Sequence, residues 1–280
     1  MIPLDGLDDP RLEDYRHVAD HEGLTARGVF VAEGRLVVER LLAHRRQRVR
    51  SVLLSSAAAE AMAGPLRAVS DQIPVFVVPQ AAMNAVVGFN IHRGCLAIAE
   101  RPAPATLDAL DLTACARLLV LEGVNNPDNV GGLFRNAAAL GVSAVVLGPH
   151  CGDPLYRKAV RTSMAAVLSL PWVDAGAWPD ALTRLHEAGL SIVACTPSAD
   201  AVSLYDAPLP RRAAVLVGAE GPGLSAEALA CADLRVRIPM LGAMDSLNVA
   251  TAAALVLSAL ARYDSSAQAS DRVTALRQPR

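Results

Sequence analysis

Continuous apolar runs in the second half of the chain constrain its fold more than any other feature. They lie at 117–124, 143–148, 191–196, 213–218 and 234–239, and helical patterns separate them at 130–140, 156–168, 178–188, 225–231 and 247–262. Strands that are apolar on both faces are typical of a parallel sheet buried between layers of helices. This half of the chain therefore predicts an α/β domain with a parallel sheet.

The first part of the chain shows the same alternation on a smaller scale. Strand-like stretches occur at 28–34, 49–55, 73–79 and 95–100, with helical patterns at 35–43 and 57–69. The segment 101–111 is proline-containing and has no periodicity, which is typical of a linker. We predict a small α/β domain over 1–107, a larger α/β domain over 108–264 and a flexible polar tail over 265–280.

Charge and composition exclude several classes of protein. The net charge of −2 differs from that of a non-specific nucleic-acid binder, although a local basic patch can still bind RNA. The N-terminus is acidic and lacks an apolar stretch, and the longest apolar run, at 249–261, is too short to cross a bilayer. The five cysteines form no CxxC pair, which favours reduced thiols over disulfides or a metal site. We expect a cytoplasmic protein with no membrane segment and no metal.

The stretch NNPDNVGGLFRNAAALG (125–141) follows the first apolar run of the larger domain and begins a helix. Asp128 or Asn129 can cap the start of this helix, and Gly141 can end it. Arg135 lies off the apolar face, so its side chain can point into a cleft at the carboxyl end of the sheet. The alternative is a strand, turn and helix with an ordinary surface arginine.

A second stretch, LVGAEGPGLS (216–225), places a glycine-rich loop directly after a strand. Glycine allows the backbone to approach a ligand closely, and Glu220 is the only charged residue of the loop. The alternative is a structural turn, because glycine-rich turns after strands are common.

The third stretch, RIPMLGAMDSLNVATAAALVLSAL (237–260), runs from a strand into a helix that Asp245 or Ser246 can cap. This helix is apolar on nearly every side and must therefore be buried, so we expect one of its sides to meet a second subunit. Packing does not explain Ser246 and Asn248 at the start of the helix, where polar groups need hydrogen-bonding partners.

Taken in this order, the three stretches resemble the signature motifs of the SpoU (TrmH-like) RNA 2′-O-ribose methyltransferases, which belong to the SPOUT class. The resemblance covers about 115–262, and FVAEGRLVVERLL (30–42) and HRGCLAIAE (92–100) resemble the RNA-binding domain that often precedes it. It implies a C-terminal parallel-sheet domain with a deep trefoil knot, preceded by a small α/β RNA-binding domain. It also implies methyl transfer from S-adenosyl-L-methionine to a ribose 2′-hydroxyl of structured RNA, with ribosomal RNA the first choice and transfer RNA the second. A homodimer formed through the C-terminal domain is implied as well.

The resemblance further implies which residues form the site. The expected catalytic residues are Arg135, Asn129, Glu220, Ser246 and Asn248. The expected cofactor-binding residues are Thr196, Leu216, Gly218, Glu220, Gly221, Ile238, Met240, Ser246 and Leu247. Because a guanidinium keeps its proton in proteins, we expect Arg135 to hold an RNA phosphate and stabilise the 2′-alkoxide, not to act as a base.

Basic residues outside these motifs are candidates for binding RNA phosphates, although a charge run is usually only a solvated face. The candidates are Arg27, Arg35, Arg45, Arg46, Arg48, Arg93, Arg157, Lys158 and Arg161. His92 precedes Arg93, and we interpret it as a structural histidine more readily than as a catalytic one.

The sequence departs from the family pattern at a few positions and leaves alternatives open. Ala165 stands where glycine is usual, Asp245 where glutamate is common, and Arg93 where glutamine is frequent. The alternatives are a catalytically silent RNA-binding or ribosome-assembly protein and a SPOUT enzyme that methylates a base nitrogen. The intact Arg135, Glu220 and Asn248 argue against the first, and Ser246-Leu247-Asn248 resembles the ribose branch. A dehydrogenase is disfavoured because no GxGxxG follows the first strand.

Overall fold

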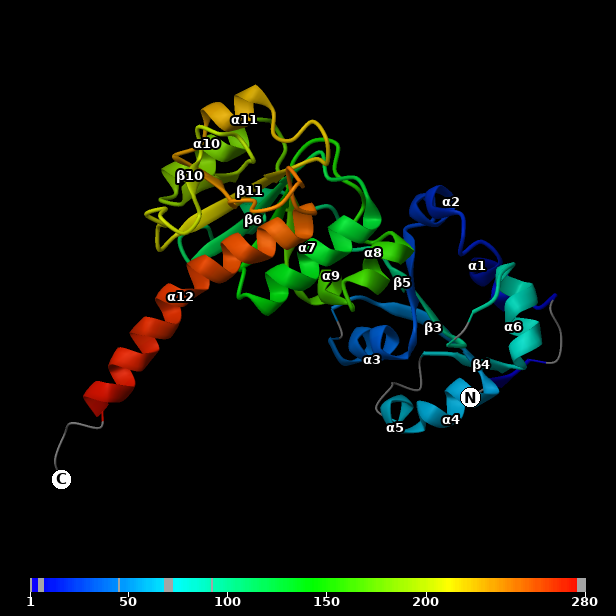
Figure 1. Cartoon of the computed structure of the whole chain (residues 1–280). Helices are drawn as coiled ribbons and strands as arrows, with labels where there is room; N and C mark the ends of the chain where they lie inside the picture. Colours follow the sequence, from blue (N-terminus) through cyan, green and yellow to red (C-terminus); the bar gives the residue numbers. More distant parts are fainter. Residues whose placement is uncertain (1, 5–7, 45, 68–72, 92, 276–280) are drawn as a thin grey trace. The chain divides into compact units, whose positions relative to one another are not determined.

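The computed structural model describes residues 2–4, 8–44, 46–67, 73–91 and 93–275 (Figure 1). The chain forms two compact units: an N-terminal unit of Met1–Ala103 with Asp153–Ser169, and a C-terminal unit of Pro104–Gly152 with Leu170–Arg280. This division differs from the predicted one, because 153–169 packs with the N-terminal part of the chain. Within that unit Arg157 forms an ion pair with Glu33, and Arg101 forms one with Asp153.

The N-terminal unit is built on a five-stranded mixed sheet in the order β1-β4-β3-β5-β2. Its strands are β1 (Ile2–Pro3), β2 (Val29–Glu33), β3 (Val49–Ser55), β4 (Val75–Val78) and β5 (Cys95–Glu100). β1, β4 and β3 are parallel, whereas β5 is antiparallel to β3 and β2. The buried hydroxyl of Tyr15 is 2.7 Å from Ser51 Oγ, a hydrogen bond that satisfies both polar groups inside the core.

Short helices cover this sheet. They are η1 (Pro10–Leu12), α1 (Glu13–Arg16), α2 (His21–Ala26), α3 (Arg35–His44), α4 (Ser56–Ala61), α5 (Ala63–Leu66), α6 (Gln80–Val87), α8 (Arg157–Thr162) and α9 (Ala166–Ser169). The single helical pattern predicted at 156–168 is thus two helices. Met164 and Ala165 between them have φ of 53° and 67°, a left-handed conformation that ends the first helix. Ala165 stands where the family that this sequence resembles usually has glycine, the residue that this conformation favours.

The C-terminal unit contains a seven-stranded sheet in the order β10-β12-β9-β11-β6-β7-β8, and every neighbouring pair is parallel. Its strands are β6 (Arg117–Glu122), β7 (Ala144–Leu147), β8 (Trp172–Asp174), β9 (Ser191–Cys195), β10 (Val202–Ser203), β11 (Ala213–Gly218) and β12 (Leu234–Arg237). The predicted parallel sheet is confirmed. β8 and β10 were not predicted, because strands this short at the edges of a sheet carry little periodicity.

The helices of this unit are η2 (Leu107–Ala109), α7 (Pro127–Ala139), α10 (Asp180–Glu187), α11 (Ala226–Ala230) and α12 (Val249–Ala275). α12 lies beside α7 and continues through most of the range predicted as a tail (Figure 1). The two helices approach closely because Gly132 has no side chain: a Cβ there would lie 3.1 Å from Ala250 Cβ. Asn136 Nδ2 also donates a hydrogen bond to Ala250 O at 2.8 Å. Among the described residues, no helix combines the length and apolar character needed to cross a bilayer.

Both predicted N-terminal helix caps of the C-terminal unit were wrong, whereas Gly141 follows the end of α7 with φ of 71°, as predicted. Asn126, and not Asp128 or Asn129, caps α7, because Pro127 takes the first helical position. At α12 the cap is Asn248, whose Oδ1 accepts a hydrogen bond from Ala250 N at 2.9 Å, in place of Asp245 or Ser246.

Candidate active site

A cavity of about 430 Å³ opens at the carboxyl ends of β9, β11 and β12. In open parallel sheets this edge is where ligands bind. The cavity walls come from residues 195–197, from the glycine-rich loop at 217–223, and from the segment between β12 and α12. The second and third stretches singled out in the sequence therefore meet at one site.

Most of the residues predicted to bind a cofactor line this cavity. They are Thr196, Gly218, Glu220, Gly221, Ile238, Met240, Ser246 and Leu247, together with Asn248 from the catalytic set. Leu216 does not line it, because its side chain is fully buried in the core on the sheet. Asn129 and Arg135 lie outside the lining, on α7.

The wall at 217–223 requires glycine. A Cβ on Gly218 would lie only 2.4 Å from the carbonyl carbon of Gly223, because the loop folds back onto its own beginning. Gly223 N donates a hydrogen bond to Ala219 O at 3.1 Å, which closes the turn. Gly221 and Gly223 have φ of 91° and 74°, a region that other residues rarely adopt. The loop therefore offers backbone, with few side chains, to a ligand.

The Asn248 side chain joins the three sequence stretches. Its Nδ2 donates hydrogen bonds to Asn129 Oδ1 at 2.8 Å and to Glu220 Oε1 at 3.1 Å. Its Oδ1 accepts from Ala250 N, and since a backbone N–H can only donate, this cap fixes which way the amide points. Asn129 is buried on α7, so the hydrogen bonds tie α7, the glycine-rich loop and the start of α12 together.

Arg135 lies two turns further along α7 and is exposed. Within the part of the chain that the structure describes, it makes no hydrogen bond or ion pair. Its guanidinium thus remains available for an anion brought by a substrate, which is the role expected from the sequence.

The charged residues in the cavity lining are Glu220 and Asp245; no lysine or arginine contributes to it among the described residues. An acidic wall favours a cationic ligand over a phosphate-rich one. Burial raises the pKa of the Cys195 thiol to about 11, so this cavity residue stays protonated at neutral pH and is a poor nucleophile. The described residues contain no group of His, Cys, Asp or Glu suited to holding a metal.

Sequence reasoning missed several residues of this region. Cys195, Pro197, Met244, Asp245, Val249 and Ala252 also line the cavity. Glu122, at the end of β6, was overlooked too, although a carboxylate that ends the apolar run RLLVLE is itself a signal. A charged residue at the carboxyl end of a central parallel strand lies at the ligand-binding edge.

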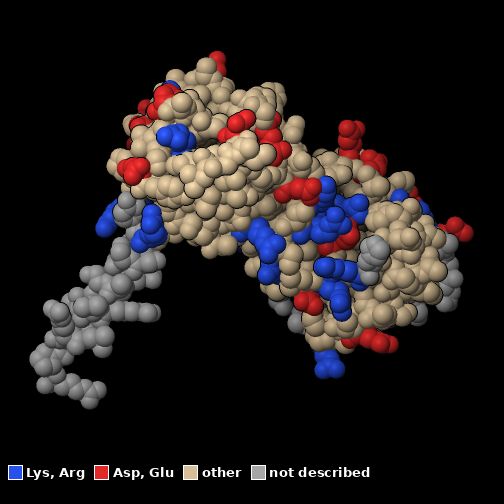
Figure 2. Space-filling model, viewed as in Figure 1, with Lys and Arg blue, Asp and Glu red and all other residues tan. Residues whose placement is uncertain are grey.

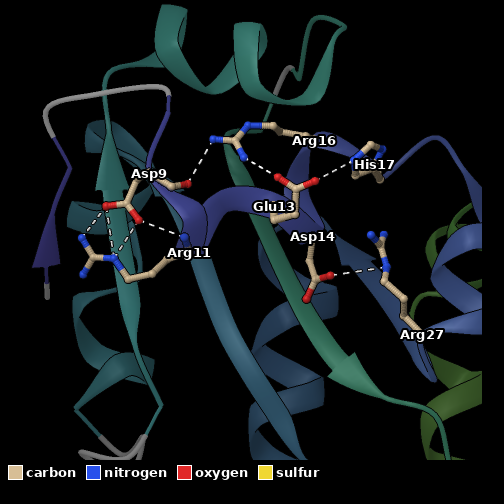
Figure 3. A network of polar contacts seen from close by, with 7 residues as sticks. All are labelled: Asp9, Arg11, Glu13, Asp14, Arg16, His17 and Arg27. Atoms are coloured by element: carbon tan, nitrogen blue, oxygen red, sulfur yellow. Dashed lines mark hydrogen bonds and ion pairs between the residues drawn. The ribbon is translucent and has the colours of Figure 1, made fainter.

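The candidate RNA-binding residues lie mainly on the N-terminal unit, over which Lys and Arg gather on the face shown in Figure 2. Several are engaged within that unit. Arg27 is 3.6 Å from Asp14 (Figure 3), Arg48 is 3.3 Å from Glu100, and Arg157 and Arg161 are 2.9 and 3.2 Å from Glu33. Arg157 also stacks on Phe89, with 4.5 Å to the ring centroid, and Arg46 donates to Ser169 O.

Arg35 and Arg93 differ from these arginines in their contacts. Both are exposed, and neither has an ion pair or hydrogen bond within the described residues. The Arg93 side chain passes beside Gly34, the residue before Arg35, at 3.8 Å from the position of a Cβ there. Lys158 is exposed on α8, while Arg45 and His92 lie outside the described residues.

A parallel α/β unit with a cavity at the carboxyl ends of its strands defines the class of open α/β proteins that bind a ligand at this edge of the sheet. Comparison with known proteins gives the family. Residues 116–258 match the model of the SpoU rRNA Methylase family, and the chain belongs to this family.

Individual relatives agree with this assignment. The chain is 44% identical over 256 residues to an uncharacterized tRNA/rRNA methyltransferase of Mycobacterium tuberculosis, covering 89% of this chain and 87% of the relative. It is 29% identical to the 23S rRNA (guanosine-2′-O-)-methyltransferase RlmB of Shewanella oneidensis, covering 79% of this chain and 92% of that one. A solved RNA 2′-O ribose methyltransferase superimposes with a TM-score of 0.77 at 27% identity, covering 94% and 99% of the two chains.

Proposed function

We propose that this protein transfers a methyl group from S-adenosyl-L-methionine to a ribose 2′-hydroxyl of structured RNA, with ribosomal RNA as the first candidate. The family and the relatives named for 23S rRNA and ribose 2′-O-methylation support this reaction. One observation carries the proposal: Asn248 bonds to both Asn129 and Glu220, so residues from all three motifs meet beside one cavity.

The cavity residues suit S-adenosylmethionine. The sulfonium of this cofactor is positively charged, which fits a lining whose charged side chains are Glu220 and Asp245. The glycine-rich loop at 217–223 and the segment 238–247 offer backbone groups for the adenosine and methionine parts. When bound, the cofactor supplies an electrophilic methyl group.

The remaining roles belong to side chains of this chain. We assign to Arg135 the binding of the phosphate beside the target ribose and the stabilisation of charge that develops on the 2′-oxygen. Asn248 and Asn129 hold α7 and the cavity loop in fixed positions through their hydrogen bonds. Glu220 and Ser246 form part of the cavity wall. In this assignment the N-terminal unit binds RNA in the cytoplasm, and the C-terminal unit carries the knot that the resemblance implies.

The direct test measures transfer of labelled methyl from S-adenosylmethionine to total RNA from a strain that lacks this protein. We expect label in one RNA species, and digestion should trace it to a 2′-O-methylated nucleotide. Label in transfer RNA would replace the ribosomal substrate, and label on a base would assign the protein to a different chemistry. Absence of both label and cofactor binding would contradict the proposed function.

RNA affinity should depend on the unpaired arginines more than on the paired ones. Arg35 and Arg93 have no acidic partner among the described residues, so RNA would not have to displace one. Replacing each by alanine should therefore weaken RNA binding about five- to tenfold and lower the salt slope by about 1. Arg48→Ala is the matched control, since Arg48 already pairs with Glu100, and its loss should be smaller. Filter binding across a salt series measures both quantities, and equal losses for all three variants would contradict this ranking.

We further propose a homodimer that covers the outer face of α12. Leu255 of α12 is a large apolar residue that is 41% exposed in the single chain, and contact with a second copy would bury it. Leu255→Arg should convert the dimer to a monomer in sedimentation equilibrium. Leu36→Arg is the matched control, because Leu36 is similarly exposed, at 37%, on α3 of the N-terminal unit. A monomeric wild-type protein would overturn this proposal.

A further inference from the structure

Glu122 is a buried carboxylate that none of the roles above uses. It ends β6, its exposure is 7%, and no cation pairs with it among the described residues. Three donors surround it instead. Trp178 Nε1 and Ser225 Oγ bond to Oε1 at 2.9 and 2.6 Å, and Ser225 N bonds to Oε2 at 2.9 Å. A buried charge is costly unless it is fully hydrogen-bonded, so this arrangement is specific to a carboxylate.

Two of these three hydrogen bonds hold the end of the cavity loop. Ser225 follows the glycine-rich turn and begins α11, where its Oγ also accepts from Ala228 N at 3.1 Å. The beginning of the turn, at Ala219, lies close to Gly123. A Cβ on Gly123, the residue after Glu122, would lie 3.1 Å from Ala219 Cβ. The end of the loop at Ser225 is therefore hydrogen-bonded to Glu122, and its beginning at Ala219 lies close to Gly123, the residue that follows β6.

The third hydrogen bond joins Glu122 to Trp178, which is not part of the cavity loop. Trp178 comes from the segment before α10, and its ring packs over the end of β7, where a Cβ on Gly148 would lie 3.1 Å from it. Neither Trp178 nor Glu122 lines the cavity. The contacts of Glu122 thus divide into two to Ser225, which lies two residues beyond the lining residue Gly223, and one to Trp178.

We propose that Glu122 is a positioning residue that sets the affinity for S-adenosylmethionine by fixing the loop 218–225. This inference rests on the proposed function, because it takes the cavity to be the cofactor site. The two oxygens of the carboxylate accept from the loop backbone and from the Ser225 hydroxyl at once. Glutamine has the same shape, but with its oxygen on Trp178 Nε1 and the Ser225 hydroxyl, its amide nitrogen faces Ser225 N, which can only donate. The loop then loses this hydrogen bond.

The test compares three variants of the full chain by calorimetric titration with S-adenosylmethionine and by thermal melting. We expect Glu122→Gln to bind about tenfold more weakly. Ser225→Ala keeps the backbone bond and should show a smaller loss. Trp178→Phe, the matched control, removes a bond to the same carboxylate without touching the loop, so its melting temperature should fall while its affinity is kept. In steady state, Glu122→Gln should raise the KM for the cofactor and leave kcat unchanged.

Two results would overturn the inference. One is wild-type affinity for S-adenosylmethionine in Glu122→Gln. The other is a single relation between loss of affinity and loss of melting temperature that holds for all three variants, Trp178→Phe included. If Glu122→Gln does not fold, the contrast between Ser225→Ala and Trp178→Phe decides the question. Failure of the proposed function looks different, since the wild-type chain itself would then show no cofactor binding.

Discussion

Arg135→Ala should lower kcat for methyl transfer about 10³-fold while leaving the affinity for S-adenosylmethionine unchanged. The side chain lies on α7, is exposed, and does not line the cavity, so its removal disturbs neither the core nor the cofactor walls. The loss should fall on kcat because the proposed contact is with charge that develops on the 2′-oxygen during the reaction. Single-turnover kinetics on the identified RNA and calorimetry with the cofactor measure the two quantities separately.

Arg135→Lys distinguishes two forms of this role. Lysine keeps the positive charge but cannot form the two parallel hydrogen bonds of a guanidinium. We expect this variant to remain well below the wild-type rate. A lysine variant with the wild-type rate would show that charge alone suffices and that the proposed geometry is wrong.

The Arg135→Ala variant can also show whether Arg135 acts at the cavity of its own chain or at that of the partner subunit. In a dimer that exchanges subunits, mixing Arg135→Ala with a variant defective in the cavity should restore about a quarter of the wild-type activity if Arg135 acts on the partner's cavity. If Arg135 acts on the cavity of its own chain, every site in the mixture lacks one component and activity stays absent.

Asn248→Asp should weaken cofactor binding by about 10- to 100-fold, because it turns a hydrogen-bond donor into an acceptor at the junction of the three motifs. In the wild-type protein the Asn248 amide donates hydrogen bonds to Asn129 and Glu220, and its Oδ1 caps α12. Aspartate would keep the cap but place a negative oxygen against Asn129 Oδ1 and the Glu220 carboxylate. Repulsion should move the cavity loop away from α7. Calorimetry with S-adenosylmethionine measures the change.

Asn136→Asp is the matched control for this prediction. Asn136 Nδ2 also joins α7 to α12, through Ala250 O at 2.8 Å, but it lies outside the cavity lining. The same chemical change there should lower the melting temperature and leave cofactor affinity intact. Equal affinity losses in both variants would mean that helix packing, and not the junction at Asn248, controls the cavity.

Much of the fold was predictable because the apolar runs carry it directly. β3 and β5 have the predicted bounds, and the central strands of the parallel sheet, among them β6 and β11, lie where the runs predicted them. The hydrophobic pattern did not predict the break at Met164 and Ala165, because left-handed backbone leaves no mark in such a pattern. The one sequence signal was that Ala165 stands where the family usually has glycine. The association of 153–169 with the N-terminal unit involves contacts between residues far apart in sequence, such as the ion pair between Arg157 and Glu33.

The sequence by itself determined the parallel sheet, the three motifs and the residue types that could form a site. Periodicity and local glycine content reflect local conformation and burial, so these features can be found without coordinates. Only the tertiary structure decided which of those residues meet. It placed the Asn248 amide between Asn129 and Glu220, and it enclosed Glu122 among three donors. It also left Arg35 and Arg93 without an ion pair to any described residue. Such contacts join residues that are distant along the chain, and only folding brings them within hydrogen-bonding distance.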